Sequence, residues 1–532
     1  MSGILFDYLL LLWVLVSILV IGVAFCHRFA RLAGIELIGY GLGAGVLFHG
    51  LLGLLIALDR HLRHYVVFLT IVCAATAIGY LIRHRVWTEL TNSLTRSLRL
   101  SLFLWLVFLG LCVALVHVEV RWPAELQDGQ YIFKQHSLNV KIQYLTALPA
   151  DNYIAYTVTE FFNRNISFKK VRPILPANEV SNRTILMSLV ALPFRTALSW
   201  GQRGVKDVGT FHYVGHLWPD VEKLNEDNSF EQFLIVGIFL NSLLLVGLLV
   251  LFSNFDSPNT LPVAALLFVT SPYFIGQTIF TWPKAMAGFF IVLSWNSIRR
   301  QHDAKVVALC LALAFHSHPS SIAVAVSIGL WYALKAWREK SGFKSALEYA
   351  GVFVLAILPW EVWTGMVLKI PSNMFAQNFA GAGTAEALAS PINFIWIRAA
   401  NAFTTLTPVM FVIYPFEPES VVGYATTSLP TVVGLFLIGF AVLECIRLAT
   451  TERMLVWHGL IIPAAVILAL YSCRAIPVLH GWQSIVGVLM FLAVLRMRRT
   501  CRPSTFRLIV LLQLMCNLAV LSLRGAVVGA HL

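Results

Sequence analysis

The feature that most constrains this chain is a series of apolar segments, each long enough to cross a lipid bilayer as one helix. A bilayer span needs about 20 apolar residues, with about 17 to 25 typical. The fold we predict from this series is all-α and polytopic. By the length rule, about fourteen spans lie near residues 5–25, 33–57, 65–82, 101–118, 233–253, 260–279, 284–298, 304–316, 320–336, 347–367, 430–448, 455–472, 481–497 and 507–525.

Composition supports this interpretation and excludes other classes of protein. Of 532 residues, 58% are hydrophobic and only 12% are charged, whereas soluble proteins carry about 25% charged residues. The net charge of +13 lies mostly in short loops, and no basic face or aromatic platform indicates a nucleic-acid partner. The eight cysteines show no CxxC spacing, so we expect neither a disulfide framework nor a zinc site. The N-terminus lacks the features of a cleaved signal peptide, and we expect its first span to be retained.

Lysine and arginine are concentrated in the short loops, and this pattern predicts the orientation of the chain. Positive charge marks the cytoplasmic loops of membrane proteins. All of these loops then fall on one side, while the N-terminus and the polar regions 119–232 and 368–429 fall on the other. This arrangement requires that residues 401–416 do not cross, and we interpret them as an interfacial or re-entrant helix. The basic residues concerned are Arg83, Arg85, Arg96, Arg99, Arg299, Arg300, Lys305, Lys335, Arg338, Lys340, Lys344, Arg447, Arg453, Arg496, Arg498, Arg499, Arg502 and Arg507.

The first polar region holds the most suggestive acid, Asp151, directly ahead of a helical pattern. Asp151 suits an N-cap, and Tyr156 and Glu160 follow at the spacing of an amphipathic helix lying along the membrane surface. An ionised acid at the mouth of a membrane cavity can act as a general base and take a proton from an acceptor hydroxyl. A plain helix cap is the competing interpretation. Asp128 is the second candidate base, although its Asp-Gly pair also suits a simple turn.

Several short motifs within residues 100–500 resemble the GT-C superfamily of membrane glycosyltransferases, which includes lipid A aminoarabinose transferases and protein O-mannosyltransferases. Asp151 and the helix end Glu160-Phe161-Phe162 resemble its first external loop, with Asn152 where a second acid often stands. Arg183 lies where the family carries a Lys/Arg-Pro-Pro-Leu stretch, although the prolines are missing here. Further similar turns are Ser271-Pro272-Tyr273-Phe274, Phe280-Thr281-Trp282-Pro283-Lys284, His316-Ser317-His318-Pro319-Ser320 and Leu479-His480-Gly481-Trp482-Gln483.

Family members use a polyprenyl-phosphate-linked sugar as donor, so the resemblance implies a phosphate site at the external face. Arginine can bind phosphate bidentately, while lysine acts as a point charge. The candidates are Arg183, Lys284 and Arg474, although snorkelling is the competing explanation for Lys284. His316 and His318 are two residues apart without a third ligand, so we predict no metal site and no cofactor. The other residues expected to touch substrate are Asn152, His316, His318 and His480.

We therefore predict a glycosyltransferase that acts by a single inverting displacement, with Asp151 as the base. The acceptor would be a lipid, a polysaccharide or a protein, and the active site would face the periplasm of a bacterial inner membrane. The predicted parts are a transmembrane extension (1–99), a GT-C-like catalytic module (100–500) and a last helix (501–532). A polysaccharide polymerase or ligase, a transporter or flippase, and a scaffold protein remain alternatives. Few charges lie in mid-span, which ranks a transporter lower.

Overall fold

The chain folds into a helical array that matches the predicted class. The computed structural model describes residues 2–117, 151–169, 174, 179–199, 228–253, 260–340, 342–370, 372, 390–406, 439–448, 450–470 and 483–530, and it has no strand in these ranges. Seven of the described helices are long and apolar enough to cross a membrane, or eight when one bent pair is taken as a single span. A multi-pass, all-α membrane protein is thus confirmed. The total of about fourteen spans stays a prediction.

The N-terminal helices approach one another closely, because glycines line the contact between α1 and α2. A Cβ atom added at Gly22 would lie 1.7 Å from the carbonyl oxygen of Gly41, and one at Gly45 would lie 2.0 Å from that of Ile18. Small residues allow membrane helices to pack backbone against backbone in this way. The elements of this part are α1 (Ser2–Phe25), η1 (Cys26–Ala30), α2 (Gly34–Leu58), η2 (Arg60–Leu62), α3 (Arg63–Arg83), α4 (Val86–Ser93) and α5 (Arg96–Val116).

The core of the array is formed around α9 (Ser229–Phe252), whose sequence is apolar on all sides and whose side chains are almost all buried. A helix that is hydrophobic all round is one that neighbours cover completely. Its neighbours include α5, α12 (Lys284–Arg299), α1 and α2, and α12 packs in turn on α13 (Ala304–Ser317). Because α1 and α2 contact α7 and α9, residues 1–99 pack within the same array as the helices that follow.

The bent pair consists of α10 (Thr260–Thr270) and α11 (Pro272–Ile279), whose axes differ by 63°. The break falls at Ser271, which is extended and precedes Pro272 at the first position of α11. Proline disfavours the helical conformation of the residue before it, and it is well tolerated at a helix start. The local sequence therefore accounts for the bend. A short turn over residues 280–283 then leads into α12.

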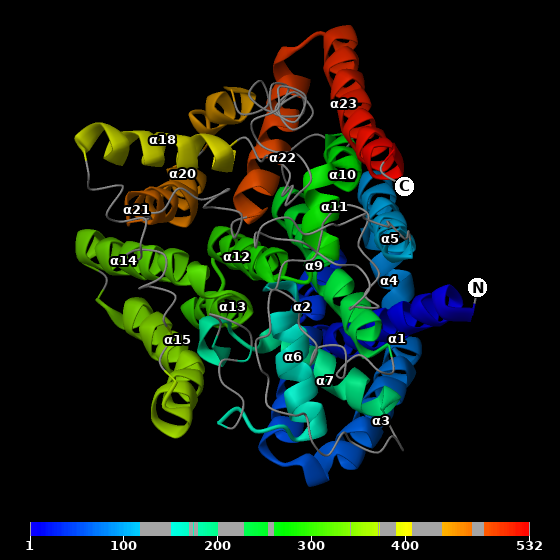
Figure 1. Ribbon diagram of the computed structural model, residues 1–532. Helices are drawn as coiled ribbons and strands as arrows, with labels where there is room; N and C mark the ends of the chain where they lie inside the picture. The colour runs from blue at the N-terminus through cyan, green and yellow to red at the C-terminus, as the bar shows by residue number, and fades with distance from the viewer. Residues whose placement is uncertain are drawn as a thin grey trace.

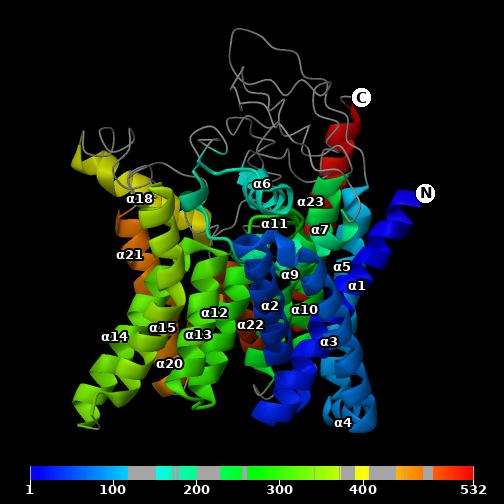
Figure 2. The same cartoon turned by 90° about the horizontal axis from the view of Figure 1, so that it is seen from below.

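Two opposite faces of the array can be distinguished in the figures. Figure 2 shows α6 (Asp151–Arg164) and α18 (Pro391–Leu406) at one side and α4 at the other, and we name these the α6 face and the α4 face. Residues 407–416 of the predicted interfacial helix lie outside the described residues. Figure 1 labels the remaining α-helices, which include α7 (Leu186–Leu198), α14 (Ile322–Glu339), α15 (Lys344–Val362), α20 (Thr450–Val456), α21 (Ile462–Leu470), α22 (Gln483–Thr500) and α23 (Pro503–Ala530). The short elements between them are η3 (Val180–Asn182), η4 (Pro319–Ser321), η5 (Trp363–Leu368) and η6 (Trp457–Ile461).

Candidate functional site

Three of the predicted substrate-binding residues meet around one indole ring, and we name the group Arg183, Trp282, Lys284 and His318 the Trp282 cluster. The Lys284 ammonium lies 2.9 Å from the centre of the Trp282 ring, and the Arg183 guanidinium lies 5.0 Å from it. The imidazole of His318 approaches the same indole, with 6.0 Å between ring centres. Lys284 and His318 are buried, while Arg183 is half-buried. Positive charge is thus concentrated at one aromatic platform.

The turn before α12 places Trp282 and Lys284. The amide of Trp282 donates to the carbonyl of Phe280, and the amide of Lys284 donates to the carbonyl of Trp282, each over 2.7 Å. Asn241 of α9 secures this turn, since its side chain donates to the carbonyl of Phe280 at 3.2 Å and accepts from the amide of Met286 at 3.3 Å. Asn241 follows the start of α9 by twelve residues, about 18 Å along the helix. The cluster therefore lies within the helix array.

His318 contributes a neutral imidazole to the cluster. It lies in the turn between α13 and η4, where its Nδ1 accepts from the amide of Ser320 at 3.3 Å. Burial, together with the charges of Lys284 and Arg183, holds the pKa of His318 well below its ordinary value of 6.5. With Nδ1 accepting, the single proton of the neutral ring is on Nε2. This Nε2 atom is buried and has no hydrogen-bond partner among the described residues.

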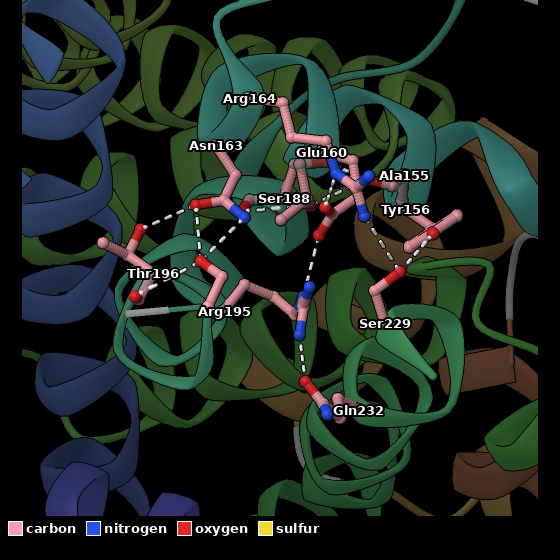
Figure 3. Close-up of polar contacts among 12 residues, drawn as sticks. Ala155, Tyr156, Glu160, Asn163, Arg164, Ser188, Arg195, Thr196, Ser229 and Gln232 are labelled. Carbon is pink, nitrogen blue, oxygen red and sulfur yellow. Dashed lines mark hydrogen bonds and ion pairs between the residues drawn. The ribbon is translucent and has the colours of Figure 1, made fainter. Parts of the chain in front are cut away.

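A second buried group, the Glu160 network, ties α6 to α7 and α9 (Figure 3). The Glu160 carboxylate accepts from Arg164 through Oε2 and from Arg195 of α7 through Oε1, both over 2.7 Å. Arg195 also donates to Gln232 of α9. Glu160 and Arg195 are 0% and 1% exposed, and buried charges of this kind require partners. The network thus fixes the position of the helix that begins at Asp151.

The predicted helix after Asp151 is present, but its inner face is more deeply buried than a surface helix would be. Tyr156 is fully buried, and its hydroxyl is 2.6 Å from the hydroxyl of Ser229. Burial and the nearby Glu160 carboxylate raise the pKa of Tyr156 well above its ordinary value, so the phenol stays protonated. Described side chains of α6 from Ile154 to Phe161 are all buried. Residues 154–161 span about two turns and so cover every side of a helix, which means that α6 is buried all round although it lies at one side of the array.

The other predicted site residues are placed only in part. α6 begins at Asp151 and continues through Asn152, but both side chains lie outside the described part of the chain. His316 is turned away from the Trp282 cluster, because its Nε2 donates to the carbonyl of Ala356 on α15 over 2.8 Å. Arg474, His480 and the alternative base Asp128 lie outside the described residues, so their roles stay predictions.

Two features of the site were missed when the sequence was read alone. Trp282 was noted as part of a motif, but its role as the platform beneath two cations was not anticipated. Arg195 was overlooked, although a single arginine inside the apolar segment 186–198 already signals a buried charge that needs an acid. Its partner Glu160 was noted only as part of a helix pattern. A search for charges within apolar segments would have found Arg195.

Comparison with known proteins adds no assignment, since no protein-family model, no curated protein and no solved structure matches this chain. The described residues contain no group of three side chains suited to a metal ion. The seven described cysteines are free. The chemistry of the site therefore has to be argued from its own residues.

Proposed function

We propose that this chain is an integral membrane glycosyltransferase that moves a sugar from a polyprenyl-phosphate donor to an acceptor at the α6 face, the periplasmic side of a bacterial inner membrane. The observation that carries the proposal is the meeting of Arg183, Lys284 and His318 at Trp282. These residues come from three separate segments of the chain. The sequence had predicted Arg183 and Lys284 as phosphate ligands and His318 as a residue that touches substrate.

The Trp282 cluster has the chemistry of a phosphate receptor. Arg183 and Lys284 supply charge-assisted donors, which bind phosphate oxygens more strongly than neutral donors do. The Nε2 proton of His318 adds a neutral donor inside the same buried group. These three donors together favour the phosphate of a lipid-linked sugar.

The proposed reaction is one displacement at the anomeric carbon of the donor sugar. Asp151, at the start of α6, accepts the proton of the acceptor hydroxyl while that oxygen forms the new glycosidic bond. The bond between the anomeric carbon and the phosphate oxygen breaks, and the polyprenyl phosphate leaves with the electron pair. Charge on the departing phosphate is stabilised by Arg183 and Lys284, which are in place before the reaction begins. The configuration of the sugar is inverted.

The proposal is tested with the purified protein in lipid nanodiscs. Native mass spectrometry measures binding of a long-chain polyprenyl monophosphate, and a second assay measures sugar transfer from polyprenyl-phosphate sugars. We expect Asp151→Asn to lower transfer about a hundredfold or more and to leave lipid binding unchanged. Lys284→Gln should weaken lipid binding at least about tenfold, because it removes a charge-assisted contact.

The matched control is Lys369→Gln, which removes an exposed lysine and should change neither property. Full transfer activity in Asp151→Asn would refute the assignment of the base. A protein that binds no polyprenyl phosphate, or binds it equally well in Lys284→Gln, would refute the phosphate site.

The bend between α10 and α11 favours one rival function, a lipid-linked glycan transporter or flippase. Transporters place substrates at discontinuous membrane helices, and this pair is bent by 63°. A flippase would equilibrate a fluorescent polyprenyl-phosphate lipid between the two leaflets of a liposome and would transfer no sugar. Such a result would replace glycosyl transfer as the proposed activity.

A further inference from the structure

A groove of about 390 Å³ runs between α14 and α15, and no residue of the Trp282 cluster lines it. It arises because small residues face one another across the two helices. Ala325, Gly329 and Ala333 recur at intervals of four on α14, which places them on one helix face, and Ala346 and Ala350 line it from α15. Both helices are among the candidate membrane spans. The groove therefore opens where the protein meets lipid.

An aromatic wall keeps the two helices from closing the groove. The Tyr349 ring stacks on Tyr332 with 5.4 Å between ring centres and on Phe353 with 6.2 Å. A Cβ atom added at Gly329 would lie 3.1 Å from the Tyr349 ring, so α14 already contacts this wall. The Tyr349 hydroxyl donates to the carbonyl of Ala325 over 2.7 Å. Since no free polar group remains in the lining, the groove suits a hydrocarbon chain and not ordered water.

One end of the groove is strongly basic. Lys335 and Arg338 lie in the last turns of α14, Lys340 follows that helix, and Lys344 begins α15. All four side chains are exposed, and none forms an ion pair with an acid among the described residues. The nearby Glu348 is already paired with Lys305 at 3.4 Å. Phe343 and Leu347, which line the groove, lie beside these cations in the chain.

We propose that the groove holds one acyl chain of an anionic phospholipid, whose headgroup binds the four cations at the turn between α14 and α15. The four cations by themselves would be explained by the orientation of the protein, because positive charge marks cytoplasmic loops. The groove beside them is the second feature that a lipid site needs, since basic pockets between membrane helices bind anionic headgroups. This lipid site is separate from the proposed donor site and does not depend on the glycosyltransferase proposal.

The test uses photo-crosslinking in nanodiscs with the full chain. Two probes carry a diazirine on the acyl chain, one with a phosphatidylglycerol headgroup and one with a phosphatidylcholine headgroup. We expect the anionic probe to label peptides of α14 and α15 at least about fivefold more than the zwitterionic probe, since each surface cation adds an attraction of the order of RT or more. Equal labelling by the two probes would overturn the proposal.

Two variants separate the groove from the cations. Ala350→Phe fills the groove and should abolish labelling of α14 and α15, while Gly351→Phe, where nothing lies within 4 Å of an added Cβ, should preserve it. Joint replacement Lys335→Gln, Arg338→Gln, Lys340→Gln and Lys344→Gln should remove the preference for the anionic probe. The same number of replacements at Arg83, Arg85, Arg96 and Arg99 should not. Undiminished labelling in Ala350→Phe, at normal thermal stability, would refute the groove as the site.

Discussion

At the scale of single residues, His318 shows how neighbours decide the charge state of a side chain. A lone histidine near a helix end titrates near neutral pH. Here burial and two cations depress the pKa of His318 well below 6.5, so the folded protein holds the ring neutral. In the unfolded chain the same ring takes up a proton below about pH 6.5. This difference in proton binding makes the free energy of unfolding depend on pH through His318.

We expect His318 to stabilise the folded state fully above pH 6.5 and to lose that contribution as the pH falls toward its depressed folded-state pKa. The unfolded state binds more protons in this window, so unfolding becomes easier by up to about 1.4 kcal/mol per pH unit. Thermal unfolding in detergent between about pH 5.5 and 7.5 measures the effect. His318→Gln should show a shallower decline than the unmodified protein. Parallel pH profiles for the two proteins would contradict this account.

At the scale of elements, the start of α6 depends on neighbouring residues, whereas its burial depends on residues far away in the chain. Its start at Asp151 was predictable, because caps and helical periodicity are properties of neighbouring residues. The burial of α6 was not predictable, because it depends on residues far away in the chain. Glu160 pairs with Arg164 in the last turn of α6 and with Arg195 of α7, and Arg195 also contacts Gln232 of α9. A helix pattern with one charged position leaves open whether that charge faces water or an arginine.

We expect Glu160→Gln to destabilise the protein by about 3 kcal/mol, because it removes the buried carboxylate charge that both Arg164 and Arg195 contact. Thermal unfolding in detergent measures the loss, and hydrogen exchange should show faster exchange in α6. The control is Glu36→Gln, whose ion pair with Arg300 is partly exposed and should contribute less than about 1 kcal/mol. In the double variant Glu160→Leu with Arg195→Met, part of the stability should return. Equal losses in Glu160→Gln and Glu36→Gln would disprove the role of the network.

At the scale of the whole molecule, the two faces of the array follow from the alternation of helices. α5 separates α4 from the segment that contains α6, and Figure 2 shows these two helices at opposite faces. The basic residues Arg83, Arg85 and Arg96 flank α4 in the chain, and this distribution of positive charge predicts that the α4 face is cytoplasmic.

Labelling of single cysteines tests this orientation. In a chain whose eight native cysteines are replaced, Lys169→Cys should react with a membrane-impermeant maleimide applied to intact cells. Thr91→Cys on α4 should react only after the membrane is opened, because the proposed topology puts α4 on the cytoplasmic side. Both positions are exposed, so burial does not limit the reaction. Reaction of both from the same side would contradict the proposed topology.

The sequence by itself determined the all-α membrane class, the places of the long apolar helices among the described residues, and the start of α6 and α12. Each of these depends on the length of an apolar run or on a few adjacent residues, which are local quantities. It also named Arg183, Lys284 and His318 one at a time, with no means of placing them together. Only the tertiary structure decided that these three meet at Trp282 while His316 bonds to α15. Which distant residues share a site depends on the face that each helix turns toward its neighbours, and packing across the whole array sets that rotation.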